Sequence, residues 1–251
     1  MPDFSAPTQR LDLELVRRDM VKSRARAQDL IKNGHVFVDG VSVRKTTKKV
    51  DQDISITINA PEIEWVGRGA LKLLAALECF DVNPAGLIAA DIGASTGGFC
   101  QVLLKHDAVK VYAVDVGHGQ LDPLIANDKR IINLEKTNAR ALTSMSITEP
   151  LDLVVSDVSF ISLKLALPAA LKLCRDGAFL LALVKPQFEV GKGNVGKGGI
   201  VRDPELVQSV PVEMTNWINS LPGWQSLGTV ESPIEGSDGN TEFLLGAKYA
   251  P

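Results

Sequence analysis

The sequence predicts an α/β fold, in which a Rossmann-like sheet of seven strands follows a small α+β module at the N-terminus. Residues 87–99 contain a short apolar run, a glycine-rich turn and the start of a helix-like segment. Apolar strand-like segments then alternate with helix-like segments towards residue 251, as in a doubly wound sheet. Residues 8–60 differ, because two short helical segments precede an alternating hairpin pattern.

The composition limits the class of protein. With 251 residues and 45% hydrophobic residues, the chain can form one large domain or a small and a medium one. Three cysteines without a C-x-x-C pair, Cys79, Cys100 and Cys174, argue against a disulfide framework or a metal site. The N-terminus lacks a signal-peptide pattern, and no apolar run approaches the roughly 18 residues of a membrane span. We therefore expect a cytoplasmic protein without a membrane partner.

We expect three segments: a module over residues 1–60, a linker over 61–68 and a large domain over 69–251. The net charge of −3 hides an excess of basic residues in the module. The linker carries Trp65, for which two interpretations stay open. The indole either packs between the domains or couples their activities.

The module begins with a helix over residues 10–18, with Leu11 and Leu15 facing inward. Ser23 is expected to cap a second helix over residues 24–32, which Asn33-Gly34 ends. Alternation around Asp39-Gly40 predicts a hairpin, and a last strand covers residues 54–58.

The module also concentrates basic side chains. Such a run is often only a solvated face, but the pattern R-L-D…S-R…A…I-x-x-G-x-V-x-V-x-G over residues 9–58 is more specific. It resembles the small RNA-binding module of the ribosomal protein S4 superfamily, which implies contact with structured RNA. The expected RNA-binding residues are Arg10, Arg17, Arg18, Lys22, Ser23, Arg24, Arg26, Lys32, Arg44 and Lys45.

The glycine-rich turn of residues 93–98 has the spacing G-x-x-x-G-G, and Asp91 precedes its first glycine by two residues. Glycines let a ligand lie against the backbone, and the following helix supplies free N–H groups. A carboxylate there suits a cationic ligand better than a pyrophosphate. The turn resembles the first motif of S-adenosylmethionine (SAM) dependent methyltransferases, although a tight turn in another α/β protein would look similar.

Further expectations follow from this cofactor. Asp115 ends the second strand, where a carboxylate can accept both ribose hydroxyls of an adenosine ligand. The resemblance implies that Asn138 lies where methyltransferases of this kind contact the adenine. The expected cofactor-binding residues are Asp91, Gly93, Ser95, Thr96, Gly97, Gly98, Phe99, Asp115, Val116, Asn138 and Asp157.

The remaining elements complete the predicted sheet. Residues 69–80 form a helix with Leu71, Leu74, Leu77 and Phe80 in the core, and Lys72 is solvated by default. A later helix over residues 165–174 tolerates Pro168 if it falls in the first turn. The other strands are expected at residues 109–114, 130–134, 151–156, 178–184, 224–230 and 242–247.

Residues 191–198 almost form a Walker A loop. The last position is Gly198, so the hydroxyl that binds magnesium is missing, and no helix follows directly. We interpret this segment as a flap over the active site.

Four residues, Lys72, Asp157, Lys185 and Glu242, complete the predicted site. Asp157 and Lys185 end neighbouring strands beside the SAM loop, where a surface ion pair is the plainer alternative. The four positions resemble the Lys-Asp-Lys-Glu set of FtsJ-type RNA 2′-O-methyltransferases. Together with the module, residues 9–249 resemble the TlyA family, also labelled hemolysin A. The resemblance implies 2′-O-methylation of cytidines in the ribosomal RNA of ribosomal subunits.

Within this set, Lys185 is the expected central residue that meets the ribose hydroxyl. Asp157 and Glu242 are expected to orient the lysines, Lys72 to position the ribose, and alignment alone to supply much of the rate. Two other functions compete: a membrane-active hemolysin, which needs an amphipathic or spanning segment, and a non-catalytic ribosome-assembly factor.

Overall fold

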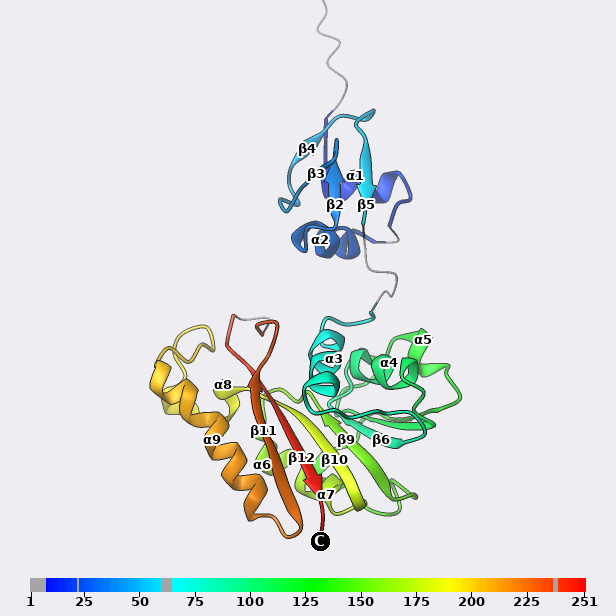
Figure 1. Cartoon of the computed structure of the whole chain (residues 1–251). Helices are drawn as coiled ribbons and strands as arrows, with labels where there is room; N and C mark the ends of the chain where they lie inside the picture. The colour runs from blue at the N-terminus through cyan, green and yellow to red at the C-terminus, as the bar shows by residue number, and fades with distance from the viewer. Residues whose placement is uncertain (1–7, 22, 60–64, 237–238) are drawn as a thin grey trace, which may run out of the picture. The chain divides into compact units, whose positions relative to one another are not determined.

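The computed structural model describes residues 8–21, 23–59, 65–236 and 239–251 (Figure 1). The chain divides into two compact units, Met1–Glu64 and Trp65–Pro251. The expected linker over residues 61–68 spans this division, and its residues 61–64 lie outside the described part. Trp65 packs against the core of the second unit.

In its described residues, the first unit packs two helices against two small antiparallel sheets. Its core joins Leu11 and Leu15 of the first helix to Leu30 and Ile31 of the second and to Val36 of the sheet. The strands pair in the orders β1-β4 and β3-β2-β5. The elements are β1 (Gln9–Arg10), α1 (Leu11–Arg17), α2 (Arg24–Lys32), β2 (Val36–Val38), β3 (Val41–Ser42), β4 (Lys49–Val50) and β5 (Ile56–Ile58).

Local sequence signals specify most of this unit. The Ser23 side chain accepts a hydrogen bond from the backbone N–H of Arg26, as expected of an N-cap. Asp39 and Gly40 have φ values of 49° and 77°, as a two-residue hairpin turn requires. The short β1-β4 pair is not predicted, because neither two-residue strand shows alternation.

The second unit contains, in its described residues, a seven-stranded sheet in the order β11-β12-β10-β9-β6-β7-β8. Strands β10, β9, β6, β7 and β8 run parallel, and β12 is antiparallel to both β10 and β11. The strands are β6 (Ile88–Ile92), β7 (Lys110–Val114), β8 (Ile131–Leu134), β9 (Leu151–Ser156), β10 (Cys174–Val184), β11 (Trp224–Glu231) and β12 (Phe243–Tyr249). The predicted fold class is confirmed.

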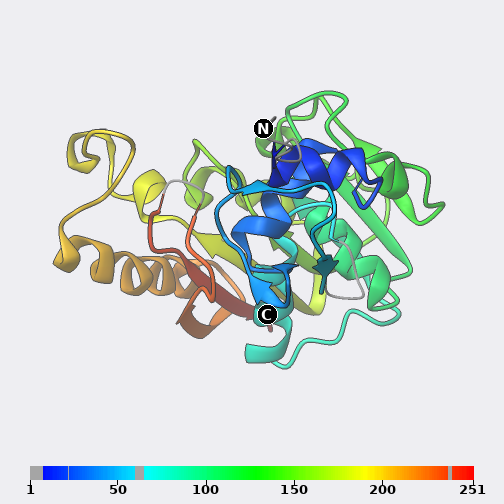
Figure 2. The same ribbon diagram turned by 90° about the horizontal axis from the view of Figure 1, so that it is seen from above.

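Helices cover both faces of this sheet (Figure 1). One core contains α3 (Ala70–Cys79) and α4 (Gly98–Lys105), and the other contains α6 (Leu163–Ala166), α7 (Pro168–Leu171) and α9 (Pro204–Ser220). Neighbouring residues of one strand alternate between these cores, as Leu153 and Val154 do. The turned view shows α9 lying along the β11-β12 side of the sheet (Figure 2). Short helices α5 (Pro123–Ala126), α8 (Pro186–Glu189), η1 (Ala139–Ala141) and η2 (Lys192–Asn194) complete the unit.

Three helical predictions need correction. In α3 the buried face is set by Ala70, Leu73 and Leu77, whereas Leu71 is 44% exposed. The helix predicted over residues 165–174 is two short helices, because Pro168 begins α7 and has no N–H to continue α6. Helix α9 was not predicted at all. Its Pro211 lies inside the helix and obscures the pattern.

Candidate active site

The glycine loop between β6 and α4 folds tightly against two neighbouring strand ends. Gly93 and Gly97 have φ values of 90° and 92°, which side chains rarely adopt. A Cβ at Gly93 would lie 3.1 Å from the carbonyl oxygen of Asp157. The backbone N–H of Gly93 donates to the carbonyl of Val114, at 2.9 Å. The loop therefore brings the ends of β6, β7 and β9 together.

Asp91 lies beneath this loop and is fully buried. Its Oδ2 accepts a hydrogen bond from the backbone N–H of Cys100, at 3.1 Å, which fixes the start of α4. Within the described residues its Oδ1 has no hydrogen-bond partner. Burial raises the pKa of the Asp91 carboxyl to about 7. Because Asp91 lines neither cavity beside the loop, direct contact with a ligand is not evident.

Two cavities flank the loop. The larger, of about 380 Å³, lies over the ends of β6, β7 and β9 and is lined partly by Asp115, Val116, Asn138 and Phe160. Asp115 accepts hydrogen bonds from the backbone N–H groups of Ser95 and Gly117, at 2.8 and 2.7 Å. Its carboxylate is therefore held in place at the wall of the cavity.

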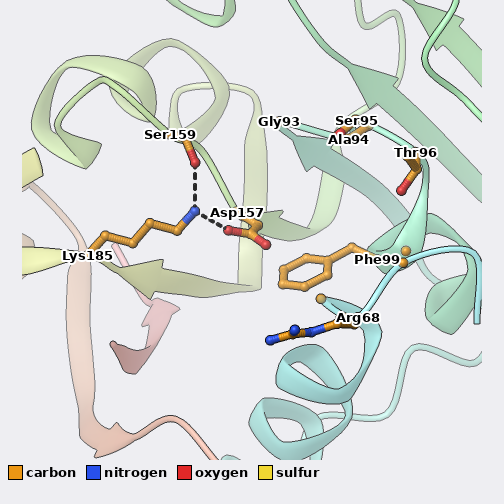
Figure 3. A pocket seen from close by; sticks show the side chains of 12 residues that line it. Arg68, Gly93, Ala94, Ser95, Thr96, Phe99, Asp157, Ser159 and Lys185 are labelled. Carbon is orange, nitrogen blue, oxygen red and sulfur yellow. Dashed lines mark hydrogen bonds and ion pairs between the residues drawn. The ribbon is translucent and has the colours of Figure 1, made fainter. Parts of the chain in front are cut away.

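The smaller cavity, of about 260 Å³, lies between the glycine loop and the residues that lead into α3 (Figure 3). The Lys185 ammonium reaches into it, 2.6 Å from Asp157 Oδ1 and 2.9 Å from Ser159 Oγ. Lys185 is only 8% exposed, so this cation is held by a carboxylate and a hydroxyl in a largely water-excluded place. The guanidinium of Arg68 extends into the same cavity beside Phe99.

The structure joins the four predicted catalytic residues as two ion pairs. Lys72 Nζ lies 2.5 Å from Glu242 Oε2, and the two residues are 7% and 3% exposed. The expectation that Lys72 is solvated is therefore wrong. Val184 pairs with Phe243 across β10 and β12, so Lys185 and Glu242 occupy the next positions on adjacent strands. Lys72 reaches them from the first turn of α3, which packs on that sheet.

Most of the predicted cofactor residues line the two cavities. The exceptions are Asp91, which lies below the loop, and Gly97. A Cβ added at Gly97 would lie 2.8 Å from Leu121 Cδ1, so glycine at this position lets Leu121 pack against the loop. Sequence reasoning missed several residues that line the cavities. Among them, only residues within two positions of Asp157 could have been found from the sequence, because they follow a strand that ends at the predicted site. The missed residues include Gly67, Arg68, Gly69, Thr137, Ser159 and Phe160.

Glu135 is another residue that sequence reasoning missed. Its carboxylate accepts the backbone N–H of Gln120, at 2.8 Å, and it also binds the backbone N–H of Gly119. These hydrogen bonds hold the pKa of Glu135 at about 2. The ionised carboxylate thus shapes the turn that carries Gln120 to the larger cavity.

The basic residues of the first unit fall into two groups. In the first group, Lys32, Arg44 and Lys45 are exposed. Of the other predicted RNA-binding residues, Ser23 serves as a helix cap, and Lys22 lies outside the described residues. The arginines of the other group form ion pairs within the unit. Arg10 and Arg24 bind Asp12, Arg17 and Arg18 bind Glu14, and Arg26 binds Asp29.

In the described residues, no group of three or more His, Cys, Asp or Glu side chains is arranged to hold a metal ion. No helix in the same part of the chain is both long and apolar enough to cross a membrane.

The fold and the site define a class, in which an S4-type RNA-binding module is joined to a methyltransferase domain. The FtsJ-like methyltransferase family matches residues 65–249, and the S4 domain family matches residues 9–53. A structure of an O-methyltransferase from Bacillus cereus is similar in fold, with 17% identity, a TM-score of 0.51 and coverage of 76% of this chain and 84% of that one.

Whole-chain relatives narrow the class. The 16S/23S rRNA (cytidine-2′-O)-methyltransferase TlyA of Mycobacterium tuberculosis is 46% identical over 94% of this chain and 88% of its own length. Hemolysin A of Brachyspira hyodysenteriae is 39% identical over 94% of this chain and 98% of its own. A solved structure from Streptococcus thermophilus covers 98% of this chain and 90% of its own, with 36% identity and a TM-score of 0.74. The chain belongs to the TlyA family.

Proposed function

We propose that this protein transfers a methyl group from SAM to the ribose 2′-hydroxyl of a cytidine in ribosomal RNA. The observation that carries this proposal is the Lys185 ammonium, held by Asp157 and Ser159 in the cavity beside the glycine loop. Relatives of the same family are named as ribosomal RNA (cytidine-2′-O)-methyltransferases. In this proposal residues 1–60 recruit the RNA, and residues 69–251 carry the chemistry.

The residues around the loop fit SAM. The larger cavity has a fixed carboxylate, Asp115, for ribose hydroxyls and a side chain with both donor and acceptor groups, Asn138, for adenine. The smaller cavity lies on the other side of Gly93, where the methionine half would be held. The buried Oδ1 of Asp91 has no partner in the described residues, and in its ionised form this carboxylate favours a cation above the loop.

SAM, when bound, supplies an electrophilic methyl group on a sulfonium, and the chain's residues must present the hydroxyl to it. Methyl transfer forms the O–C bond, breaks the C–S bond with its electron pair on sulfur, and frees the hydroxyl proton. Lys185 Nζ contacts the hydroxyl and, if uncharged, takes this proton. Asp157 and Ser159 fix the orientation of the Lys185 amine. Alignment of the hydroxyl therefore contributes to the rate even when Lys185 stays charged.

The second ion pair, between Lys72 and Glu242, lies next to Lys185 and supports the site. The buried Lys72 and Glu242 pair joins the first turn of α3 to the start of β12, next to Lys185. We propose that Lys72 positions the ribose and that Glu242 orients Lys72. The carboxylate leaves little freedom to the ammonium, which suits a positioning role.

The test is labelled methyl transfer from SAM to purified 30S and 50S subunits, followed by mapping of the modified nucleotide. Lys185→Ala should lower the single-turnover rate by at least about a hundredfold and leave SAM affinity within a few-fold. Lys185→Arg should fail as well, because guanidinium keeps its proton. The exposed Lys172 offers a matched control, and Lys172→Ala should react at the wild-type rate.

The pH profile separates the two roles of Lys185. For a general base, the single-turnover rate rises with pH and then levels off. A flat profile between about pH 6 and 9, with an inactive alanine variant, assigns Lys185 to orientation alone. A Lys185→Ala variant with the wild-type rate would remove this residue from the reaction, and absence of methyl transfer to either subunit would refute the proposed function.

A further inference from the structure

Asp12 is a fully buried carboxylate of α1 that accepts hydrogen bonds from β1 and from α2 of the first unit. Arg10 donates to it from Nε and Nη2, both at 2.9 Å. From α2, Arg24 Nε donates at 3.0 Å and Gln28 Nε2 at 2.8 Å. Two guanidiniums that are 14 residues apart in sequence thus converge on one oxygen, Asp12 Oδ2.

The carboxylate is a strong electrostatic template. Burial opposes its ionised form, but the hydrogen bonds from Arg10, Gln28 and Arg24 outweigh burial and hold the pKa of Asp12 well below its usual range. The ionised form of Asp12 is therefore the favoured one in the folded unit. Two arginines this close repel each other, and the negative charge between them offsets that repulsion.

The arginines keep outward-facing donors in this arrangement. Their side chains are 37% exposed for Arg10 and 52% exposed for Arg24. Among the described residues, Nη1 of Arg10 and both Nη atoms of Arg24 contact no acceptor. A guanidinium has five N–H donors, so each arginine can bind Asp12 through one edge and an external anion through another.

The neighbouring Arg18 is different. Its Nε donates to Glu14, its Nη1 to the carbonyl of Ile54, at 2.8 Å, and its Nη2 to the carbonyl of Gln52, at 2.7 Å. All three of its nitrogens serve the fold, although Arg18 was among the expected RNA-binding residues. Arg18 therefore braces the unit, whereas Arg10 and Arg24 keep donors available beside Asp12.

We propose that Asp12 is a positioning residue, which presents Arg10 and Arg24 as a preformed clamp for an RNA phosphate. This inference rests on the proposed function of the first unit as the RNA recruiter. A phosphate offers several acceptor oxygens to the two exposed edges, and charge-assisted hydrogen bonds of this kind are strong. Because Asp12 already fixes both side chains, binding costs less conformational entropy than it would for two free arginines.

The charge of Asp12 makes the proposal testable, because the clamp and simple electrostatics predict opposite changes in RNA affinity when this charge is removed. Asp12→Asn makes the protein more positive, so electrostatics alone would strengthen binding to RNA. The clamp predicts the opposite, because the two arginines lose the charge that orders them. Asp51 is an exposed residue of the same unit, and Asp51→Asn changes the net charge equally without touching the clamp.

The experiment uses the full chain, with binding to purified 50S subunits measured at about 50 to 300 mM salt. We expect Asp12→Asn to weaken binding about fivefold or more and to reduce the salt slope by about one. Asp51→Asn should bind as tightly as the wild type or more tightly. Far-UV circular dichroism and thermal melting confirm that the compared variants are folded. Binding of folded Asp12→Asn equal to that of Asp51→Asn would overturn the clamp.

A second variant keeps the proposal testable if Asp12→Asn does not fold. Arg24→Lys retains the positive charge at an exposed site. Once the lysine ammonium binds Asp12, however, it has no second planar edge, as a guanidinium has, with which to bind phosphate. It should weaken binding several-fold, and wild-type affinity would overturn the clamp. Methyl transfer measured in parallel should show a raised KM for RNA with kcat retained. Absence of methyl transfer by the wild type would refute the proposed function. The comparison of RNA binding between the variants would still test the clamp.

Discussion

The buried ion pair of Lys72 and Glu242 gives a prediction whose size follows from the structure. The charged atoms lie 2.5 Å apart, and the residues are only 7% and 3% exposed. Glu242→Gln removes the counter-charge and leaves the Lys72 ammonium buried. Breaking a buried pair in this way costs about 3–5 kcal/mol. In a domain of this length, about 3 kcal/mol lowers Tm by roughly 6–12 °C.

The assay is urea and thermal unfolding of the full chain at neutral pH, next to methyl transfer. Glu213→Gln is the matched control, because Glu213 pairs with Lys164 at the surface and its side chain is 54% exposed. That change should cost less than about 1 kcal/mol. The double variant Lys72→Met, Glu242→Leu should recover most of the stability and transfer no methyl group.

The outcomes separate stability from chemistry. If Glu242→Gln costs no more than Glu213→Gln, the pair is not desolvated and the reasoning from burial fails. If the apolar double variant is stable and active, the pair contributes to folding alone, and Lys72 does not position the ribose.

Three further predictions concern the cofactor side of the site. The raised pKa of Asp91, about 7, lies above that of the unfolded chain, so the contribution of this group to stability falls as pH rises from about 4 to 7. Asp91→Asn should remove that loss, and equal changes in Tm between pH 5 and 8 in both proteins would contradict the pKa argument. Gly97→Ala should cost about 2 kcal/mol or more in urea unfolding, since φ is 92° and the new Cβ meets Leu121; a smaller loss would show that the loop can relax. Asp115→Ala should weaken SAM binding by about 1 kcal/mol or more in calorimetry, and unchanged affinity would displace the ribose from this carboxylate.

Local patterns accounted for much of the fold. The strand over residues 151–156 is observed with the predicted limits, because four of its six residues are apolar and the strand is buried on both faces. The hairpin at Asp39-Gly40 and the cap at Ser23 also depend on residues close in sequence. Helix α3 shows the limit of such patterns. Its apolar residues nearly surround the helix, so periodicity placed Leu77 correctly in the core but also turned Leu71 inward and left Lys72 in solvent.

The candidate site divides in the same way. The sequence by itself determined the glycine loop and placed Asp115, Asp157 and Lys185 at strand ends, because each has a fixed position relative to a strand or a motif. Lys72 and Glu242 entered the predicted catalytic set through the family resemblance. Only the tertiary structure decided that Lys185 pairs with Asp157 and Lys72 with Glu242, since β12 runs antiparallel beside β10. Only the tertiary structure likewise separated Arg24, which keeps free edges, from Arg18, which braces the unit. The charge of each side chain is encoded locally, but its partner and its burial depend on segments distant in sequence that meet only when the chain folds.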